Sequence, residues 1–163
     1  MYHEELIKEC SKIITENIEL PKKLPRSIRI VLIEHYSNLK DKNKLLHMAG
    51  DGWKSTYLNI CDRVMSKLNS PKATNLIKCY NEFVAVEKVS DFWGVSEQSI
   101  NNFVKVRGEI AHNGRGAEYI KIKQLESLIK TISKTTKEND KAILDFMKDT
   151  YISGRAPWYR ING

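Results

Sequence analysis

An arginine and a histidine stand five residues apart in the segment RGEIAHNGR, which spans residues 107 to 115. A histidine can give and take protons close to neutral pH. An arginine carries a permanent charge and five N–H donors, whose geometry matches the oxygens of a carboxylate or a phosphate. Arg107 and His112 therefore form a pair that can bind, and act on, an anionic group such as a phosphate.

The pair is predicted to lie on one helix, over SEQSINNFVKVRGEIAH, residues 96–112. Ser96 suits the N-cap of this helix, while Asn113 and Gly114 favour its end. At 100° per residue, Arg107 falls near the middle of a ~100° arc of apolar side chains, which are Ile100, Phe103, Val104 and Ala111.

Each member of the pair has a structural interpretation beside the functional one. An arginine within an apolar arc needs an anionic partner, because burial removes its hydration. For Arg107 that partner is either a carboxylate of another helix or a bound phosphate. His112 can serve simply as a cation at the helix C-terminus, although the same position raises its pKa and favours proton donation. The two side chains point about 140° apart on a regular helix, and Gly108 leaves room for a phosphate between them.

The segment FVKVRGEIAHNG strongly resembles the R-x(4–6)-H signature of HEPN domains, in which an arginine precedes Ile-Ala-His and a glycine at a helix end. The preceding segment, VSDFWGVSEQSINNFVKV, is similar to the apolar turn and amphipathic helix that lead into this signature in the RiboL-PSP-HEPN group. The resemblance covers residues 80–114 well and the N-terminal helices only as a general pattern.

This resemblance implies a helical bundle that often dimerises and brings two Arg/His pairs together in a cleft. It also implies a metal-independent endoribonuclease, needing no cofactor, that acts as toxin or effector in a prokaryotic toxin–antitoxin or antiphage defence system. Arg107 and His112 match the two defining positions, so the implied products carry 2′,3′-cyclic phosphate and 5′-hydroxyl ends. RNA contacts are expected from three flanking residues, Lys105, Asn113 and Arg115.

One position departs from the HEPN pattern. The residue after the arginine is usually polar, often asparagine, whereas this chain has Gly108. If the missing side chain orients the histidine or the RNA, activity is reduced, shifted or absent. The alternative is therefore a catalytically inert HEPN domain that binds RNA, a nucleotide or a protein partner. A purely structural helical interaction domain is a third possibility.

The rest of the chain predicts an all-α, up-and-down helical bundle with additional helices, because nearly every long segment has helical periodicity. We expect one domain over residues 1–152 and a C-terminal tail over residues 153–163. The segment 26–39 is apolar on more than one side and is predicted to be the most buried helix. After the break NGRG, two separate helices are predicted, over residues 118–134 and 139–149.

Composition adds weaker indications about partners and location. The net charge of +7 and the pI of about 9.2 favour anionic partners such as nucleic acid, or simply a soluble basic surface. Lysines of the late helices form either a phosphate track or a solvated face, namely Lys121, Lys123, Lys130, Lys134 and Lys137. Trp158 and Tyr159, between Arg155 and Arg160, suit either RNA stacking or docking of the tail on the bundle.

The cysteines and the apolar segments complete these expectations. Three cysteines without a C-x-x-C pair predict reduced core thiols and no zinc site. The most apolar stretch, IRIVLI, is far shorter than the ~20 residues of a membrane helix, and the N-terminus has no apolar signal core. We therefore expect a cytoplasmic protein without a membrane partner.

Overall fold

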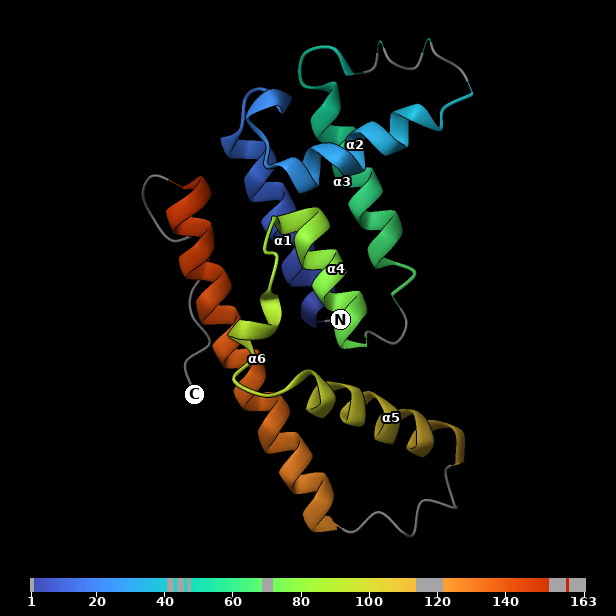
Figure 1. Cartoon of the computed structure of the whole chain (residues 1–163), viewed down its shortest axis with the longest axis vertical. Coiled ribbons are helices and arrows are strands. Elements are labelled where there is room, and N and C mark those ends of the chain that lie inside the picture. Colours follow the sequence, from blue (N-terminus) through green and yellow to red (C-terminus); the bar gives the residue numbers. More distant parts are fainter. Residues whose placement is uncertain are drawn as a thin grey trace.

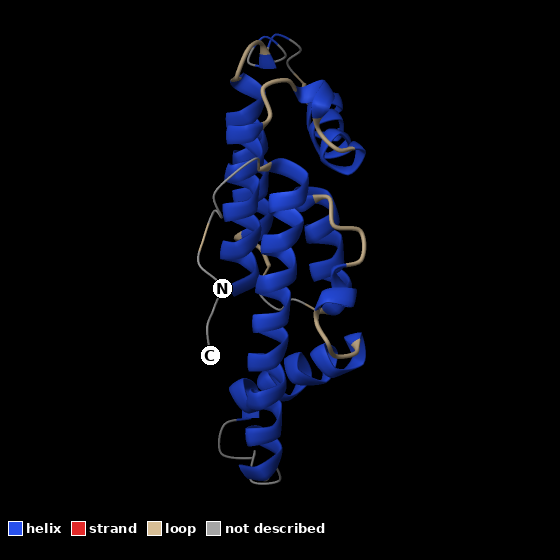
Figure 2. Ribbon diagram, turned by 90° about the vertical axis from the view of Figure 1, so that its left-hand side faces the viewer, coloured by secondary structure: helices blue, strands red, loops and turns tan. Residues whose placement is uncertain are grey.

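The computed structural model describes residues 2–40, 43, 46, 48–68, 72–113, 122–152 and 158. Every regular element within these ranges is helical (Figures 1 and 2), which confirms the prediction of an all-α bundle. The six α-helices are α1 (Tyr2–Asn17), α2 (Arg26–Ser37), α3 (Gly52–Met65), α4 (Ala73–Val84), α5 (Glu97–Asn113) and α6 (Ile122–Tyr151). Two short 3-10 helices, η1 (Pro21–Lys23) and η3 (Val89–Phe92), lie between them.

The core forms where α1 packs against α3, α4 and α6. Apolar residues at spacings of three and four give α1 a buried stripe, with Ile7, Cys10 and Ile14 fully inaccessible to solvent. The aromatic rings that fill the centre come mainly from α3, α4 and the turn after η3, and they are Trp53, Tyr57, Tyr80, Phe83 and Trp93. The burial of these large rings is the main apolar contribution to stability.

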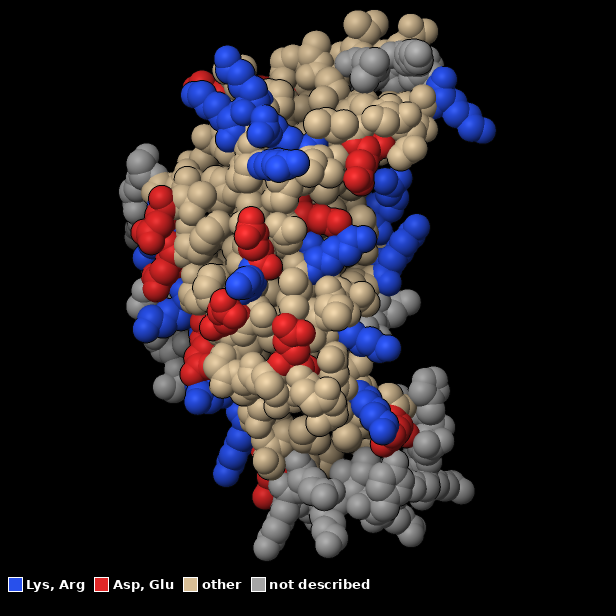
Figure 3. All heavy atoms as spheres, viewed as in Figure 1, with Lys and Arg blue, Asp and Glu red and all other residues tan. Residues whose placement is uncertain are grey.

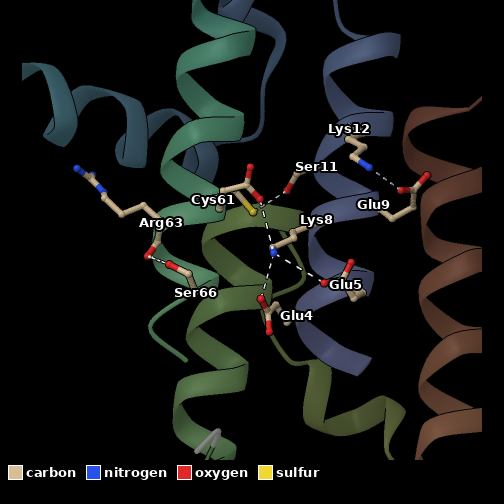
Figure 4. Close-up of polar contacts among 10 residues, drawn as sticks. Glu4, Glu5, Lys8, Glu9, Ser11, Lys12, Cys61, Arg63 and Ser66 are labelled. Carbon is tan, nitrogen blue, oxygen red and sulfur yellow. Dashed lines mark hydrogen bonds and ion pairs between the residues drawn. The ribbon is translucent and has the colours of Figure 1, made fainter. Parts of the chain in front are cut away.

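Polar contacts join α1 to α3 at one side of the core (Figure 4). Lys8 donates to Glu4 of its own helix at 3.0 Å and lies 3.7 Å from Asp62 of α3. Deeper in, the hydroxyl of Ser11 lies 3.4 Å from the thiol of Cys61. The cysteines are free and buried, as predicted, and burial raises the pKa of Cys61 to about 11. This thiol is therefore a packing group rather than a nucleophile.

The region predicted to hold two late helices forms one continuous helix instead. α6 runs for 30 residues, and residues 135–138, taken as the break, lie inside it. The hydroxyl of Thr135 donates a hydrogen bond to the backbone carbonyl of Thr131. The side-chain amide of Asn139 donates a hydrogen bond to the hydroxyl of Tyr80 at 3.2 Å. The prediction is wrong because polar residues that interrupt an apolar stripe do not by themselves end a helix, and none of residues 135–138 is a glycine or a proline.

The prediction that residues 26–39 form the most buried helix is also wrong. Only Ile28 and Leu32 of α2 are buried, whereas Ile30 is 41% and Ile33 is 61% exposed. α2 crosses one end of the bundle and contacts α3 and α4 by one face (Figure 1). Its second apolar face therefore has no covering element among the described residues.

Candidate functional site

The helix that carries Arg107 and His112 begins where the sequence predicts. Ser96 accepts a hydrogen bond on its side chain from the backbone N–H of Ser99 at 3.2 Å, which is the geometry of an N-cap. Asn101 accepts a hydrogen bond from the backbone N–H of Ala73, the first residue of α4. This contact ties α5 to the bundle close to its start. The remainder of α5 extends away from the core (Figure 1).

Both signature residues lie on the last two turns of α5, which ends at Asn113. Their separation along the helix axis is about 7.5 Å, at 1.5 Å per residue. The side chains of His112 and Asn113 lie outside what the structure describes, as does the whole of Arg115. The predicted catalytic role of His112 and the predicted RNA contacts of Asn113 and Arg115 therefore remain predictions.

Arg107 is exposed, and the structure gives it no carboxylate partner among the described residues. A buried ion pair between Arg107 and a described residue of another helix is therefore not present. The physical reason is that α5 contacts α4 near its start and then diverges, so the apolar arc around Arg107 does not face the core. Ile100 is buried, but Ile110, which lies beside this arc, is 37% exposed.

Arg107 lines an apolar groove between α5 and α6, with a volume of about 300 Å³. The other lining residues are all apolar, namely Phe103, Val106 and Ile110 of α5 with Leu125, Leu128 and Ile129 of α6. Ile129 is 62% exposed at the side of this groove. A cation beside apolar walls is a favourable place for an anion, because an anion that fills the groove displaces water that would screen the charge.

The described lysines of α5 and α6 form only weak ion pairs or none. Lys105 lies 3.9 Å from Glu109 in an exposed i,i+4 pair, which has little strength. Lys134 is in a similar pair with Glu138, at 3.7 Å, whereas Lys130 and Lys137 are exposed without an ion pair among the described residues. The interaction of these lysines with RNA stays a prediction, as does that of Lys105.

Gly108 lies on α5 with open space around it. Apart from the adjoining residues and backbone of α5 itself, no atom of the described residues lies within 4 Å of the position that a Cβ would take. A side chain at this position would therefore meet no steric barrier within the described structure. An asparagine would therefore fit at this position, whereas the predicted space beside the imidazole of His112 involves a side chain outside the described residues.

Two further predictions concern the tail and metal binding. Trp158 is half-buried and packs against the core, which favours docking of the tail over a free stacking platform. Arg155, Tyr159 and Arg160 are outside the described residues. Within the described ranges, no group of three or more His, Cys, Asp or Glu side chains could hold a metal ion. The described helices include none that is long and apolar enough to cross a membrane.

A second cluster of charged groups lies in a cleft between α2, α3 and α4 that sequence reasoning missed. The cleft has a volume of about 450 Å³ and contains Glu34, His35, Arg63, Lys78 and Glu82. Burial raises the pKa of Glu82, and burial together with the charge of Arg63 lowers the pKa of His35. These residues come from three helices without a common spacing, so no motif could have grouped them. Their charges balance, and no reaction follows from the arrangement.

No family model matches the chain, and neither a curated protein nor a solved structure is significantly similar to it. The likeness to HEPN domains therefore rests on residues 80–114 alone. The geometry adds an exposed arginine on the wall of an apolar groove, with a histidine five residues further along the same helix.

Proposed function

We propose that the chain is a metal-independent endoribonuclease of the HEPN type, acting as toxin or effector in a prokaryotic toxin–antitoxin or antiphage defence system. The observation that carries this proposal is the state of Arg107. It is exposed on the groove wall without a carboxylate partner among the described residues, so its charge is available to a phosphate. A histidine placed on the same helix supplies the proton transfer that cleavage of RNA requires.

The proposed reaction uses the substrate's own nucleophile. The 2′-hydroxyl attacks the adjacent phosphorus and loses its proton to a histidine, while the bond to the 5′-oxygen breaks and that oxygen gains a proton. Arg107 stabilises the negative charge that develops on the phosphoryl oxygens. Because the nucleophile is internal, proximity replaces activation of a water molecule by a metal. The products carry a 2′,3′-cyclic phosphate and a 5′-hydroxyl.

A homodimer completes the proposed site. One histidine per chain cannot both accept and donate a proton in the same step, whereas two-fold symmetry brings a second Arg/His pair. The apolar groove supports this arrangement, because exposed Ile110 and Ile129 form a surface that a second copy would cover. In this arrangement the two 107–112 segments face one another.

The test is to incubate purified protein with total RNA in EDTA and to map the fragment ends. Cleavage that yields 2′,3′-cyclic phosphate and 5′-hydroxyl ends, and that disappears in Arg107→Ala and in His112→Ala, supports the proposal. Arg63→Ala and His35→Ala are matched controls, because they remove the same residue types from the other cleft. Cleavage that survives in either signature variant, or that disappears equally in the controls, contradicts it.

The alternative is a catalytically inert HEPN domain that binds RNA, and the observation favouring it is the empty space at Gly108. If the missing polar side chain limits catalysis, Gly108→Asn should cleave RNA faster than the natural chain. If both forms bind RNA and neither cleaves it, the binding function replaces the nuclease.

A further inference from the structure

The outer face of α2 exposes apolar and cationic side chains together. Arg26, Arg29, Ile30 and Ile33 occupy positions i, i+3, i+4 and i+7, so they lie within about 100° of the helix circumference. All four are exposed, and they lie opposite the buried residue Ile28. We call these four residues the outer stripe of α2.

The segment before α2 extends this surface. Lys22 and Lys23 of η1 are exposed, and Leu20 just before them is 45% exposed. The eight residues 22–29 contain four cations and no carboxylate. The structure pairs none of these cations with a carboxylate among the described residues. In Figure 3, Lys and Arg side chains gather over η1 and the start of α2.

The two exposed isoleucines on one side of α2 are not explained by the folding of this chain. Isolated apolar residues on a surface need no explanation, but Leu20, Ile30 and Ile33 lie close in the sequence to four cations that have no carboxylate partner among the described residues. Side chains at i, i+3, i+4 and i+7 form the ridge by which one helix packs against another. The surface therefore suits a helical occupant that is apolar in the middle and acidic at its edges.

We propose that the outer stripe of α2, with η1, is the docking site of an acidic amphipathic helix of a protein partner. Charge complementarity selects the occupant, since the four cations require carboxylates and the isoleucines require apolar side chains. This inference goes beyond the proposed nuclease and does not depend on it. α2 and α5 lie toward opposite ends of the molecule (Figures 1 and 2), so the helix would not cover Arg107.

Two other classes of partner fit the stripe less well. A single-stranded nucleic acid needs aromatic platforms for its bases, whereas the stripe offers aliphatic side chains between its arginines. An anionic membrane presents negative charge over its whole surface, so it would repel exposed Glu19 and Glu34, which lie on both sides of the cationic segment. A protein helix can place its own charges to match both signs.

The test uses a designed peptide as the probe. Its sequence forms a helix of about sixteen residues with leucines at i, i+3, i+4 and i+7, flanked by glutamates; the control peptide is a scrambled isomer of the same composition. We expect fluorescence anisotropy to show micromolar binding of the designed peptide alone. Amide chemical-shift changes in the labelled protein should be confined to residues 20–37.

Variants connect the binding to the stripe. The double variant Arg26→Glu/Arg29→Glu should weaken binding about tenfold, because each substitution replaces an attractive exposed charge contact with a repulsive one. Ile33→Ser should weaken it severalfold without changing the charge. The matched control is Lys67→Glu with Lys88→Glu, which reverses two exposed lysines elsewhere and should leave binding unchanged. Each variant should melt at the temperature of the natural chain.

Three outcomes would overturn the proposal. In the first, the scrambled peptide binds as well as the designed one, or the control pair weakens binding as much as the arginine pair. In the second, phosphatidylserine vesicles or single-stranded RNA shift the 20–37 amides while the peptide does not. In the third, the designed peptide shifts amides elsewhere on the chain.

Discussion

For Arg107 and His112, the sequence predicts the helix that carries them but not the exposure of the arginine. The signature residues and their helix could be predicted, because helical spacing and capping are local properties of the chain. The exposure of Arg107 could not be predicted, since it depends on α5 leaving the bundle after its first turns. An apolar arc shows which side chains can be covered, whereas the neighbouring elements decide whether they are.

Removal of the Arg107 side chain should leave the fold intact. Arg107→Ala is expected to change the free energy of unfolding by less than about 0.5 kcal/mol, because the residue is exposed and alanine is the better helix former. His112→Ala should cost at most about 1 kcal/mol, through loss of a cation at the helix end. Urea denaturation followed by circular dichroism measures both. A loss above 2 kcal/mol in Arg107→Ala would restore the structural interpretation of that residue.

His3 should make stability depend on pH. Its Nδ1 lies 3.0 Å from the hydroxyl of Tyr80, and burial lowers the pKa of His3 from 6.5 to about 4. In this range the unfolded chain binds the proton more readily, so the free energy of unfolding falls as pH decreases from 6.5 towards 4, by on the order of 2 kcal/mol. His3→Gln should flatten this part of the profile. The measurement is urea denaturation between pH 7 and pH 5, and parallel profiles for both proteins would contradict it.

At the scale of the elements, periodicity predicted α1, α3, α4 and α5 but not how α6 and α2 are used. Residues 135–138 contain no glycine or proline, and the helix continues through them. The interruption of the apolar stripe therefore marks a change in what the helix packs against and not its end. α2 has apolar residues on two sides, yet it contacts the bundle with one. The assembled bundle determines which side of α2 is covered, so the sequence of this helix alone does not predict it.

The turn after η3 sets the start of α5, and Gly94 is its critical residue. Gly94 has a φ of +62°, and a Cβ on it would overlap the carboxylate of Glu138 on α6. Gly94→Ala is expected to destabilise the chain by about 1 to 2 kcal/mol, from the backbone strain of a non-glycine residue at positive φ. The overlap adds little, because the Glu138 carboxylate is the end of a flexible side chain that can move away, so the cost should be about the same in a Glu138→Ala background. A cost that falls by more than about 1 kcal/mol in that background, measured by urea denaturation, would show that the carboxylate is a rigid obstacle.

At the scale of the whole molecule, two apolar surfaces lie toward opposite ends of the chain, and they should serve different contacts. Ile129 in the groove and Ile33 on α2 are exposed to almost the same degree, at 62% and 61%. A glutamate at either position has the same intrinsic cost, so each variant is the matched control of the other. We expect Ile129→Glu to convert a homodimer, with twice the mass of the 18.9 kDa chain, into a monomer because the charge is desolvated in the interface.

The same pair of variants separates the two proposals. Ile33→Glu should remain dimeric and keep any RNA cleavage, but it should no longer bind the designed peptide. Ile129→Glu should still bind the peptide, but its RNA cleavage should fall by at least about tenfold because the composite site no longer forms. Light scattering at tens of micromolar measures the first property and fragment mapping the second. If the natural chain is a strict monomer, the composite site is excluded, and Arg107 must then act with groups of its own chain. If Ile33→Glu instead dissociates a dimer, α2 is the surface between copies. No second copy then faces the groove beside Arg107, and RNA bound there would contact the groups of one chain only.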